Sequence, residues 1–280
     1  MNRTQRAKSV FDALRKVIPE PETELEYENT WQLLVAVMLS AQCTDARVNI
    51  VSPALFKRFP DSASMLGCTS DDVLPWIRSI SYPNSKAKHL VQTANILHER
   101  FGGQVPGTID ELVQLQGVGR KTAQVVASVA FNVPALAVDT HVFRVANRIG
   151  LVTRAATTPE KVERQLKSLL PEASWGDAHH LLILHGRYTC SARSPNCKAC
   201  TASAACDYFS RLERLPKPRQ GLDSKMGKYY CASRNHYFDV PDQVSDRYRV
   251  DQVSCPKCGS MNVFLSKSGI STKQILDFRV

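Results

Sequence analysis

Apolar residues recur every three or four positions through the first 215 residues, in segments that Pro, Gly and Asn separate. This spacing gathers apolar side chains on one face of a helix, and no segment here alternates apolar and polar residues as a half-buried strand does. The pattern therefore predicts an all-α body. We expect its helices over residues 4–18, 30–43, 46–58, 70–77, 85–101, 108–115, 121–131, 140–149, 158–170 and 175–188.

The pattern changes after Leu215. Pro216, Pro218 and Gly221 stand among Lys and Arg, which is typical of a linker. The region 216–280 carries 11 Lys and Arg against 6 Asp and Glu and shows only short apolar alternation. We therefore expect a separate C-terminal extension. The basic, amphipathic N-terminus also fits a transit peptide, but we interpret it as the first helix of the body.

Composition and charge narrow the class of protein. With 280 residues, of which 43% are hydrophobic, the chain can bury one large core or two smaller ones. A net charge of +10 favours a polyanionic partner such as a nucleic acid. The longest apolar segment, 31–39, is shorter than the ~18 residues that a membrane-spanning helix requires. We therefore expect no membrane insertion.

Four cysteines lie close together near residue 200. Cys190, Cys197, Cys200 and Cys206 follow the spacing C-x6-C-x2-C-x5-C. So compact a set of thiolates can hold either zinc or an iron–sulfur cluster, and the spacing alone leaves the metal open. Two disulfides are the alternative, but the chain shows no secretory signal, and cytosolic thiols are kept reduced. We expect a metal centre here.

A glycine pair between two helical patterns is the second candidate site. Gly117 and Gly119 lie in the segment LQGVGRKTA, directly before Arg120 and Lys121. Glycines let a turn adopt backbone angles that other residues avoid, so that successive N–H groups can point outward at the start of the next helix. This is a helix-hairpin-helix that can bind a phosphate, although most such glycine pairs are only tight turns.

These segments together resemble the endonuclease III family of base-excision DNA glycosylases. The cysteine spacing, which follows HHLLILHGRYTC, resembles the family's cluster loop, and LQGVGRKTA resembles its hairpin. The resemblance continues in VDTHVFRVANRIG, WQLLVAVMLSAQCTD and PNSKA, and it covers roughly residues 1 to 210. It implies a [4Fe–4S] cluster on the four cysteines. It also implies a two-part helical fold. We expect residues 25–133 to form a helical domain with the hairpin and residues 1–24 with 134–212 to form the cluster domain. The extension 213–280 follows them.

The resemblance implies a bifunctional glycosylase and AP lyase that removes oxidised pyrimidines from duplex DNA. The family's attacking lysine matches Lys121, which would form a Schiff base with the deoxyribose before β-elimination cuts the strand. A free lysine amine has a pKa of ~10.4, so its surroundings must disfavour the ammonium. The family's catalytic aspartate matches Asp139, which can stabilise positive charge on the sugar and can also cap the helix that starts at Thr140.

Other matching residues are expected to contact DNA. A damaged base must leave the duplex before it can react, and Gln42 and Tyr82 are the candidates to fill the vacated space. Tyr82 stands where the family often has an aliphatic wedge, and a loop tyrosine without this role is the alternative. The resemblance assigns Asp45 and His141 to the pocket for the damaged base. We expect further DNA contacts from Gly117, Gly119, Arg120 and Arg193.

Two other functions remain open at this point. An adenine glycosylase of the same superfamily shares the cysteine spacing, but that branch lacks the lysine and has a catalytic Glu where this chain has Ala36. A non-catalytic DNA-binding or redox-sensing protein is the third alternative. In every case we expect a monomer whose partner is double-stranded DNA with a damaged base or abasic site. We expect a cytoplasmic, nucleoid-associated protein of bacterial type.

The extension contains a candidate zinc site. Cys255 and Cys258 resemble a zinc knuckle, and Cys231 with His236 can supply two further ligands. The alternative is a tail with reduced thiols. We expect His179, His180 and His185 to be packing or polar-surface residues, because their spacing does not place them on one face of a helix. Cys43 and Cys68 are expected to be buried thiols.

Overall fold

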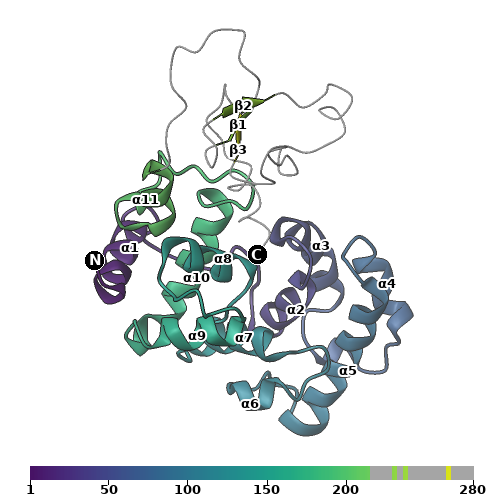
Figure 1. Ribbon diagram of the computed structural model, residues 1–280. Helices are drawn as coiled ribbons and strands as arrows, with labels where there is room; N and C mark the ends of the chain where they lie inside the picture. Colours follow the sequence, from purple (N-terminus) through teal and green to yellow (C-terminus); the bar gives the residue numbers. More distant parts are fainter. Residues whose placement is uncertain (215–228, 232–235, 239–262, 266–280) are drawn as a thin grey trace. The chain divides into compact units, whose positions relative to one another are not determined.

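The structure is a computed structural model in which residues 1–214, 229–231, 236–238 and 263–265 are described (Figure 1). Through residue 214 the chain is helical, which confirms the prediction of an all-α body. The α-helices are α1 Arg3–Arg15, α2 Thr30–Ser40, α3 Asp45–Arg58, α4 Ser70–Ile77, α5 Pro83–Phe101, α6 Ile109–Leu112, α7 Arg120–Phe131, α8 Thr140–Ile149, α9 Pro159–Lys167, α10 Trp175–Tyr188 and α11 Asp207–Arg214.

Helices α1, α2, α6 and α9 each end three residues before their expected end, and α11 lies where no helix was expected. Helix α6 is a single turn instead of spanning 108–115. Thr108 caps its start by accepting a hydrogen bond from the Glu111 amide at 3.2 Å, but the chain must then turn to enter the hairpin. Helix α11 was not predicted, although Tyr208, Phe209 and Leu212 lie on one face of it.

The chain forms two compact units. The larger unit comprises 14–143 and 154–183, and the smaller one comprises 1–13, 144–153 and the described residues from 184 onward. Helices α8 and α10 each contribute residues to both units. The three-part division expected from the resemblance stays a prediction.

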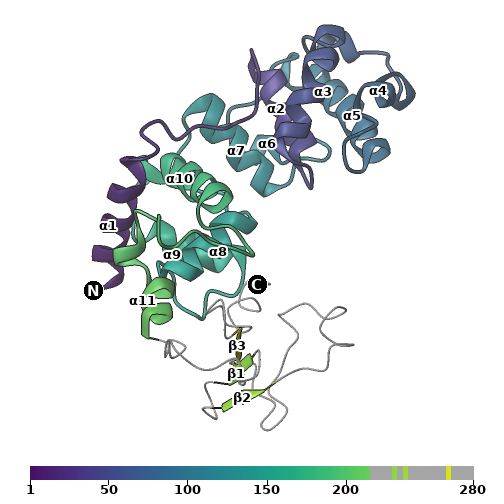
Figure 2. The ribbon, with the colours of Figure 1, turned by 90° about the horizontal axis from the view of Figure 1, so that it is seen from above.

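Helix α2 is the centre of the larger unit. All of its residues from Trp31 to Leu39 are buried, and it packs against α3, α5 and α7 (Figure 2). A helix that is apolar on every face belongs in a core, which explains the long apolar segment in the sequence. Asn29 caps its start by accepting a hydrogen bond from the Gln32 amide at 2.9 Å.

No helix among the described residues is long and apolar enough to cross a membrane.

In the smaller unit, Arg6 joins the first helix to the last. Its guanidinium donates to the carbonyls of Gly150 and Ala205, each at 3.0 Å, and forms an ion pair with Asp207. Helices α1 and α11 consequently lie side by side in both ribbon views (Figures 1 and 2). The start of the chain and the segment after the last clustered cysteine are therefore held together.

The described part of the extension is a small antiparallel sheet. Strand β1 Tyr229–Cys231 lies between β2 His236–Phe238 and β3 Val263–Leu265. In its register Cys231 is the direct cross-strand partner of His236. The other two candidate zinc ligands, Cys255 and Cys258, lie outside the described residues, so the zinc site stays a prediction.

Candidate active site and cluster loop

The hairpin between α6 and α7 requires glycine at its first position. Gly117 has a φ of +76°, in the left-handed region that favours glycine. A Cβ added there would lie 2.7 Å from Nδ1 of His89 on α5, so that the His89 side chain would have to shift. The hydroxyl of Thr93, also on α5, donates to the Gln116 carbonyl at 2.9 Å. Helix α5 therefore fixes the hairpin, and the prediction that Gly117 allows its backbone angles is confirmed. The DNA contact of Gly117 stays a prediction.

Gly119 has a different reason to be glycine. Its φ of −83° and ψ of 170° are open to any residue, so the prediction that it relieves the backbone was wrong. A Cβ added at Gly119 would meet no atom within 4 Å. Gly119 is the N-cap of α7, and no side chain caps this helix. The missing side chain therefore leaves open space in front of the uncapped amides of α7, where an anion is favoured.

Lys121 and Asp139 lie at the starts of helices α7 and α8. Lys121 lies exposed in the first turn of α7. Asp139 caps α8, since one of its oxygens accepts the Val142 amide at 2.7 Å, and its side chain is only 11% exposed. The predicted capping role is confirmed. The positive charge of Lys121 acts on the Asp139 carboxyl, so the two groups share one electrostatic site.

The surroundings of Asp139 keep it ionised. Burial raises the pKa of its carboxyl, but hydrogen bonds from the His141 ring and the Val142 amide lower it more, and Lys121 lowers it further. The net result is a pKa well below the usual range. His141 Nδ1 lies 3.1 Å from Asp139 Oδ2, so His141 belongs to this site, while its place in the base pocket stays a prediction. A fixed carboxylate beside an amine is suited to stabilise a cation that forms between them.

His179 on α10 supports the segment that leads to Asp139. Its Nδ1–H donates to the Ala137 carbonyl at 2.7 Å, and the ring is 3% exposed. Burial, aided by the charge of His180, lowers the pKa of His179 to about 4, so the ring is neutral at pH 7. His179, His180 and His185 are all buried, which confirms packing. The hydrogen bond from His179 to Ala137 was not predicted, because the two residues are 42 positions apart in the sequence.

The two candidates for insertion into DNA share an unusual backbone. Gln42 has a φ of +56° and Tyr82 a φ of +55°, although neither is glycine. Gln42 is exposed after the end of α2, and Tyr82 is 63% exposed directly before α5. Left-handed residues with long side chains are uncommon and cost free energy, so the surrounding structure must hold them.

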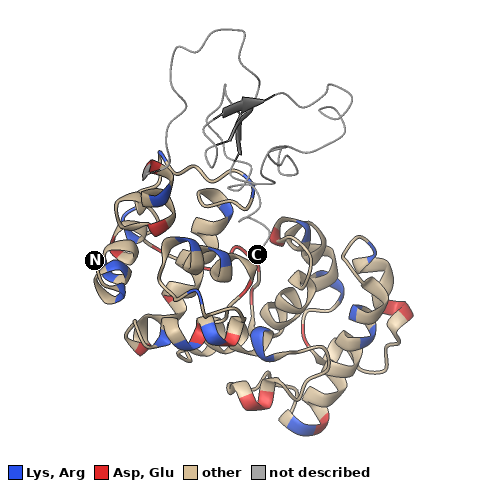
Figure 3. Ribbon diagram, in the orientation of Figure 1, with Lys and Arg blue, Asp and Glu red and all other residues tan. Residues whose placement is uncertain are grey.

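The remaining predicted DNA contacts are more scattered. Asp45 is half-buried in the first turn of α3, behind the N-cap Thr44. Arg120 is exposed, with a guanidinium nitrogen 3.7 Å from Glu163. Acidic and basic residues are mixed on α9, which carries Glu163 (Figure 3). Glu163 is largely buried and pairs with Lys167 at 2.8 Å, whereas the Arg120 side chain is 67% exposed, so the longer pair with Arg120 is weak. Arg193 is exposed in the smaller unit.

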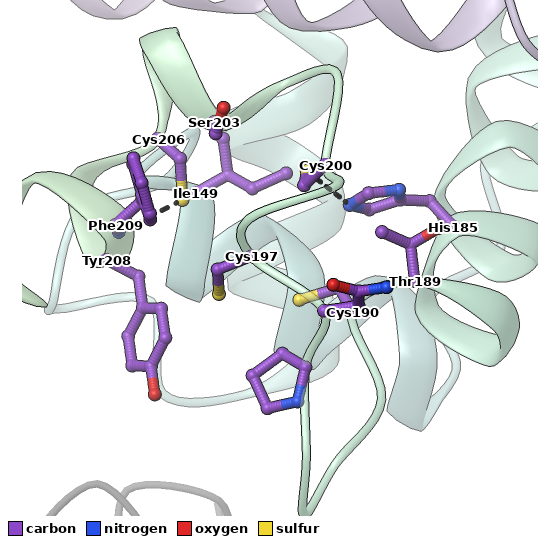
Figure 4. Close-up of a pocket in the computed structure, with 12 residues that line it drawn as sticks. Ile149, His185, Thr189, Cys190, Cys197, Cys200, Ser203, Cys206, Tyr208 and Phe209 are labelled. Carbon is purple, nitrogen blue, oxygen red and sulfur yellow. Dashed lines mark hydrogen bonds between the residues drawn. The ribbon is translucent and has the colours of Figure 1, made fainter. Parts of the chain in front are cut away.

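All four clustered cysteines line one hollow in the smaller unit (Figure 4). Cys190 and Cys206 are buried, and Cys197 and Cys200 are partly buried. Burial and the three neighbouring thiols raise the pKa of Cys197 to about 11. Four thiolates this close therefore require a compensating positive charge. All cysteines among the residues through 214 are free thiols, so the disulfide alternative finds no support there.

The two kinds of metal centre arrange their thiolates differently. In a zinc site four sulfurs surround one ion at ~2.3 Å, so they must converge on one point. In the described part of the chain, no three Cys, His, Asp or Glu side chains converge in that way. A four-iron cluster binds each thiolate to a different iron, so its sulfurs surround a space. The four thiols line one hollow, which is compatible with the cluster that the resemblance implies.

Two buried arginines hold the start of the cluster loop. From α8, Arg144 donates to the Gly186 carbonyl at 2.8 Å and to the Cys190 carbonyl at 3.3 Å. One turn later, Arg148 donates to the carbonyls of Ser191 and Ala192, both at 2.7 Å. Sequence reasoning missed this role. The signal was available, because two arginines four residues apart share one face of a helix.

A larger hollow, of about 570 Å³, lies elsewhere in the larger unit. Its lining includes Tyr27, Asn132 and Asp177, but neither Lys121 nor Asp139. The chemistry of the candidate site therefore does not belong to this hollow.

Comparisons with known proteins agree with this site. Residues 35–172 match a family model described as HhH-GPD superfamily base excision DNA repair protein. The chain is 45% identical to endonuclease III of Rickettsia felis, over 72% of this chain and 93% of the relative. It is 41% identical to endonuclease III of Escherichia coli, over 76% of this chain and all of the relative. A solved structure of a trapped endonuclease III–DNA covalent intermediate superposes with a TM-score of 0.72 and 40% identity, over 76% of this chain and 100% of that one.

Proposed function

The chain belongs to the endonuclease III family, and we propose that it excises oxidised pyrimidines from duplex DNA with Lys121 as its nucleophile. It is a DNA glycosylase and AP lyase of base excision repair, and its partner is damaged duplex DNA. One observation supports the assignment of the nucleophile most strongly. Lys121 projects from an uncapped helix start, beside an ionised Asp139 and next to the open space at Gly119.

The proposed reaction has two stages. In the first, the uncharged amine of Lys121 attacks C1′ of the deoxyribose, and the damaged base leaves with the bonding electrons and takes up a proton. The C–O bond of the sugar ring then opens to give a Schiff base between Nζ and C1′. In the second stage a proton leaves C2′, the C3′–O bond breaks and the 3′ phosphate departs. Water hydrolyses the Schiff base and restores the free lysine.

Asp139 acts in this scheme through its charge. Because its pKa lies well below the usual range, it is a carboxylate at neutral pH and has no proton to donate. Positive charge develops on the sugar as the base departs, and a carboxylate held at a helix cap stabilises that charge without reorganisation. His141 keeps the carboxylate oriented through its 3.1 Å hydrogen bond.

The hairpin supplies the proposed phosphate contact. Gly119 lets a phosphate oxygen approach the first amides of α7 closely, and the helix dipole favours the negative charge. Gln42 and Tyr82 would occupy the space that the extruded nucleotide leaves in the duplex. Asp45 would line the base pocket, while Arg120 and Arg193 would contact the backbone of the DNA.

We further propose that Cys190, Cys197, Cys200 and Cys206 hold a [4Fe–4S] cluster. The hollow that all four thiols line and the resemblance to the family support this choice. Bound there, the cluster would supply iron–thiolate bonds that tie the loop together. Lys121 and Asp139 suffice for the bond changes of the proposed reaction.

We propose a cytoplasmic localisation, because the relatives named above are bacterial proteins.

An adenine glycosylase is less compatible with the site. The position at which that branch has its catalytic Glu is Ala36, which is fully buried inside α2. No observation favours this second function.

A trapping experiment tests the proposal. The protein is mixed with a duplex that contains one thymine glycol, and borohydride is added to reduce any Schiff base to a stable bond. We expect wild type and the control Lys161→Gln to give a covalent complex and strand cleavage, and Lys121→Gln to give neither. Lys161 is an exposed lysine of α9 outside the site. Failure of wild type on both this lesion and an abasic site would refute the lyase assignment.

A further inference from the structure

We propose that Lys86 is a positioning residue that holds both insertion turns, those of Gln42 and Tyr82, in the conformation that enters DNA. This inference rests on the proposed roles of these two side chains. Lys86 lies in the first turn of α5, on an element that also supports the hairpin. Its side chain is only 8% exposed, although lysine is among the residues most often exposed.

One residue contacts the backbone of both turns. The ammonium of Lys86 donates to the Leu39 carbonyl at 2.8 Å and to the Ala41 carbonyl at 2.6 Å, across 47 and 45 residues of sequence. The Ala41 carbonyl belongs to the peptide bond that precedes Gln42. The backbone amide of Lys86 donates to the Tyr82 carbonyl at 3.1 Å. Because this amide hydrogen bond is the first main-chain bond of α5, the Lys86 side chain ties the turn of Gln42 to the helix start that carries Tyr82.

The turn that carries Gln42 needs this support. The Cys43 amide donates to the Ser40 carbonyl at 3.0 Å, with Ala41 at φ −58° and ψ 114° and Gln42 at φ +56°. These values are those of a type II turn, which prefers glycine at the position of Gln42. A glutamine there costs about 1 kcal/mol or more and persists only when its surroundings fix it.

Tyr82 is held against its preference in two ways. Its φ of +55° and ψ of 51° are left-handed, and the following residue is Pro83. A residue before proline normally adopts an extended conformation. Its ring is 63% exposed, so little burial compensates for the cost. A strained, exposed aromatic residue is better explained by an intermolecular role than by folding.

The chemistry of the contact also points to function. Within the described residues no carboxylate pairs with Lys86, and its ammonium donates to carbonyls at the end of α2. Burial lowers the pKa of Lys86, which shows that the site disfavours the ammonium. An apolar residue at this position would leave the Leu39 and Ala41 carbonyls without the donor that they have in Lys86. The ammonium caps the negative end of the α2 dipole and at the same time fixes the peptide before Gln42.

The test compares a reaction that requires insertion with one that does not. Excision of thymine glycol from a duplex requires the base to be flipped, whereas borohydride trapping at an abasic site in single-stranded DNA requires only Lys121. For Lys86→Met we expect duplex excision in single turnovers to fall by about 10- to 100-fold, and single-strand trapping to stay within about 2-fold. The matched control is Lys88→Met, which removes an exposed lysine from the same helix and should change neither.

A second comparison separates positioning from folding. If Lys86 acts through the two insertion residues, Lys86→Met should cause little further loss in a protein that already carries Gln42→Ala and Tyr82→Ala. Additive losses, equal losses on both substrates or an unchanged duplex rate would each overturn the proposal. If Lys86→Met does not fold, the ratio of duplex excision to single-strand trapping is measured for Lys86→Arg. Failure of wild-type protein to trap at all would instead refute the proposed function.

Discussion

The two hairpin glycines should respond in opposite ways to the same substitution. Gly117→Ala forces a left-handed alanine, which costs about 1–2 kcal/mol, and places its Cβ 2.7 Å from the His89 ring. With the displacement of that ring, we expect a loss of about 2–4 kcal/mol in the free energy of unfolding. For a unit of this size, that loss lowers Tm by roughly 5–15 °C.

Gly119→Ala should leave stability nearly unchanged. Its backbone angles suit alanine and its Cβ would meet nothing within 4 Å. Alanine is a poorer N-cap than glycine, but it also restricts the unfolded chain, and these effects offset each other to within about 0.5–1 kcal/mol. The added methyl group would occupy the space proposed for a phosphate. The loss of one charge-assisted contact corresponds to a rise in Kd of roughly 10-fold or more.

Two measurements distinguish the effects of Gly117→Ala and Gly119→Ala. Thermal unfolding followed by circular dichroism gives Tm, and fluorescence anisotropy with a duplex that carries a stable abasic analogue gives Kd. Gly117→Ala should lower Tm substantially, whereas Gly119→Ala should raise Kd with Tm close to wild type. If Gly119→Ala binds DNA as tightly as wild type, the phosphate contact at this hairpin is refuted. A large fall in Tm for Gly119→Ala would contradict the geometry.

Two further predictions concern groups that support the site and the loop. The folded-state pKa of His179 is about 4, so the unfolded chain binds more protons than the folded protein below pH 6.5. The free energy of unfolding should therefore fall by roughly 3 kcal/mol as the pH drops from about 6.5 to 4. Urea unfolding at pH 7 and 4.5 should show this fall in wild type and a smaller one in His179→Gln; equal falls would contradict the assignment. Arg148→Gln should lower the iron content of the purified protein, because it removes the bonds to Ser191 and Ala192, whereas Arg193→Gln, at an exposed position, should keep it. Equal iron in both variants would refute the role of Arg148.

Much of the fold could be predicted from periodicity. Helices α4, α8 and α10 have the predicted bounds, because each has a regular apolar face between clear breaks. We did not predict α11, although its apolar residues share one face, and its position depends on the ion pair of Asp207 with Arg6. Such long-range contacts leave no local pattern in the sequence.

The sequence could predict which residues form the candidate site, but not which residues hold them in place. Lys121 and Asp139 were matched to the family, and the structure brings their charges together. The contacts of His179 with Ala137 and of Lys86 with Leu39 join residues more than 40 positions apart, so only the fold reveals them. Gly117 and Gly119 look equivalent in the sequence. Their φ values, +76° and −83°, separate a structural glycine from one that leaves room for a ligand.

The most direct test of the account is to identify the atom that becomes bonded to DNA. The borohydride-trapped complex with an abasic-site duplex is digested with protease and nuclease, and the modified peptide is sequenced by mass spectrometry. The account predicts a reduced deoxyribose adduct on Nζ of Lys121, in the peptide that begins helix α7. An adduct on any other amine, such as the N-terminus or Lys86, would contradict the central assignment.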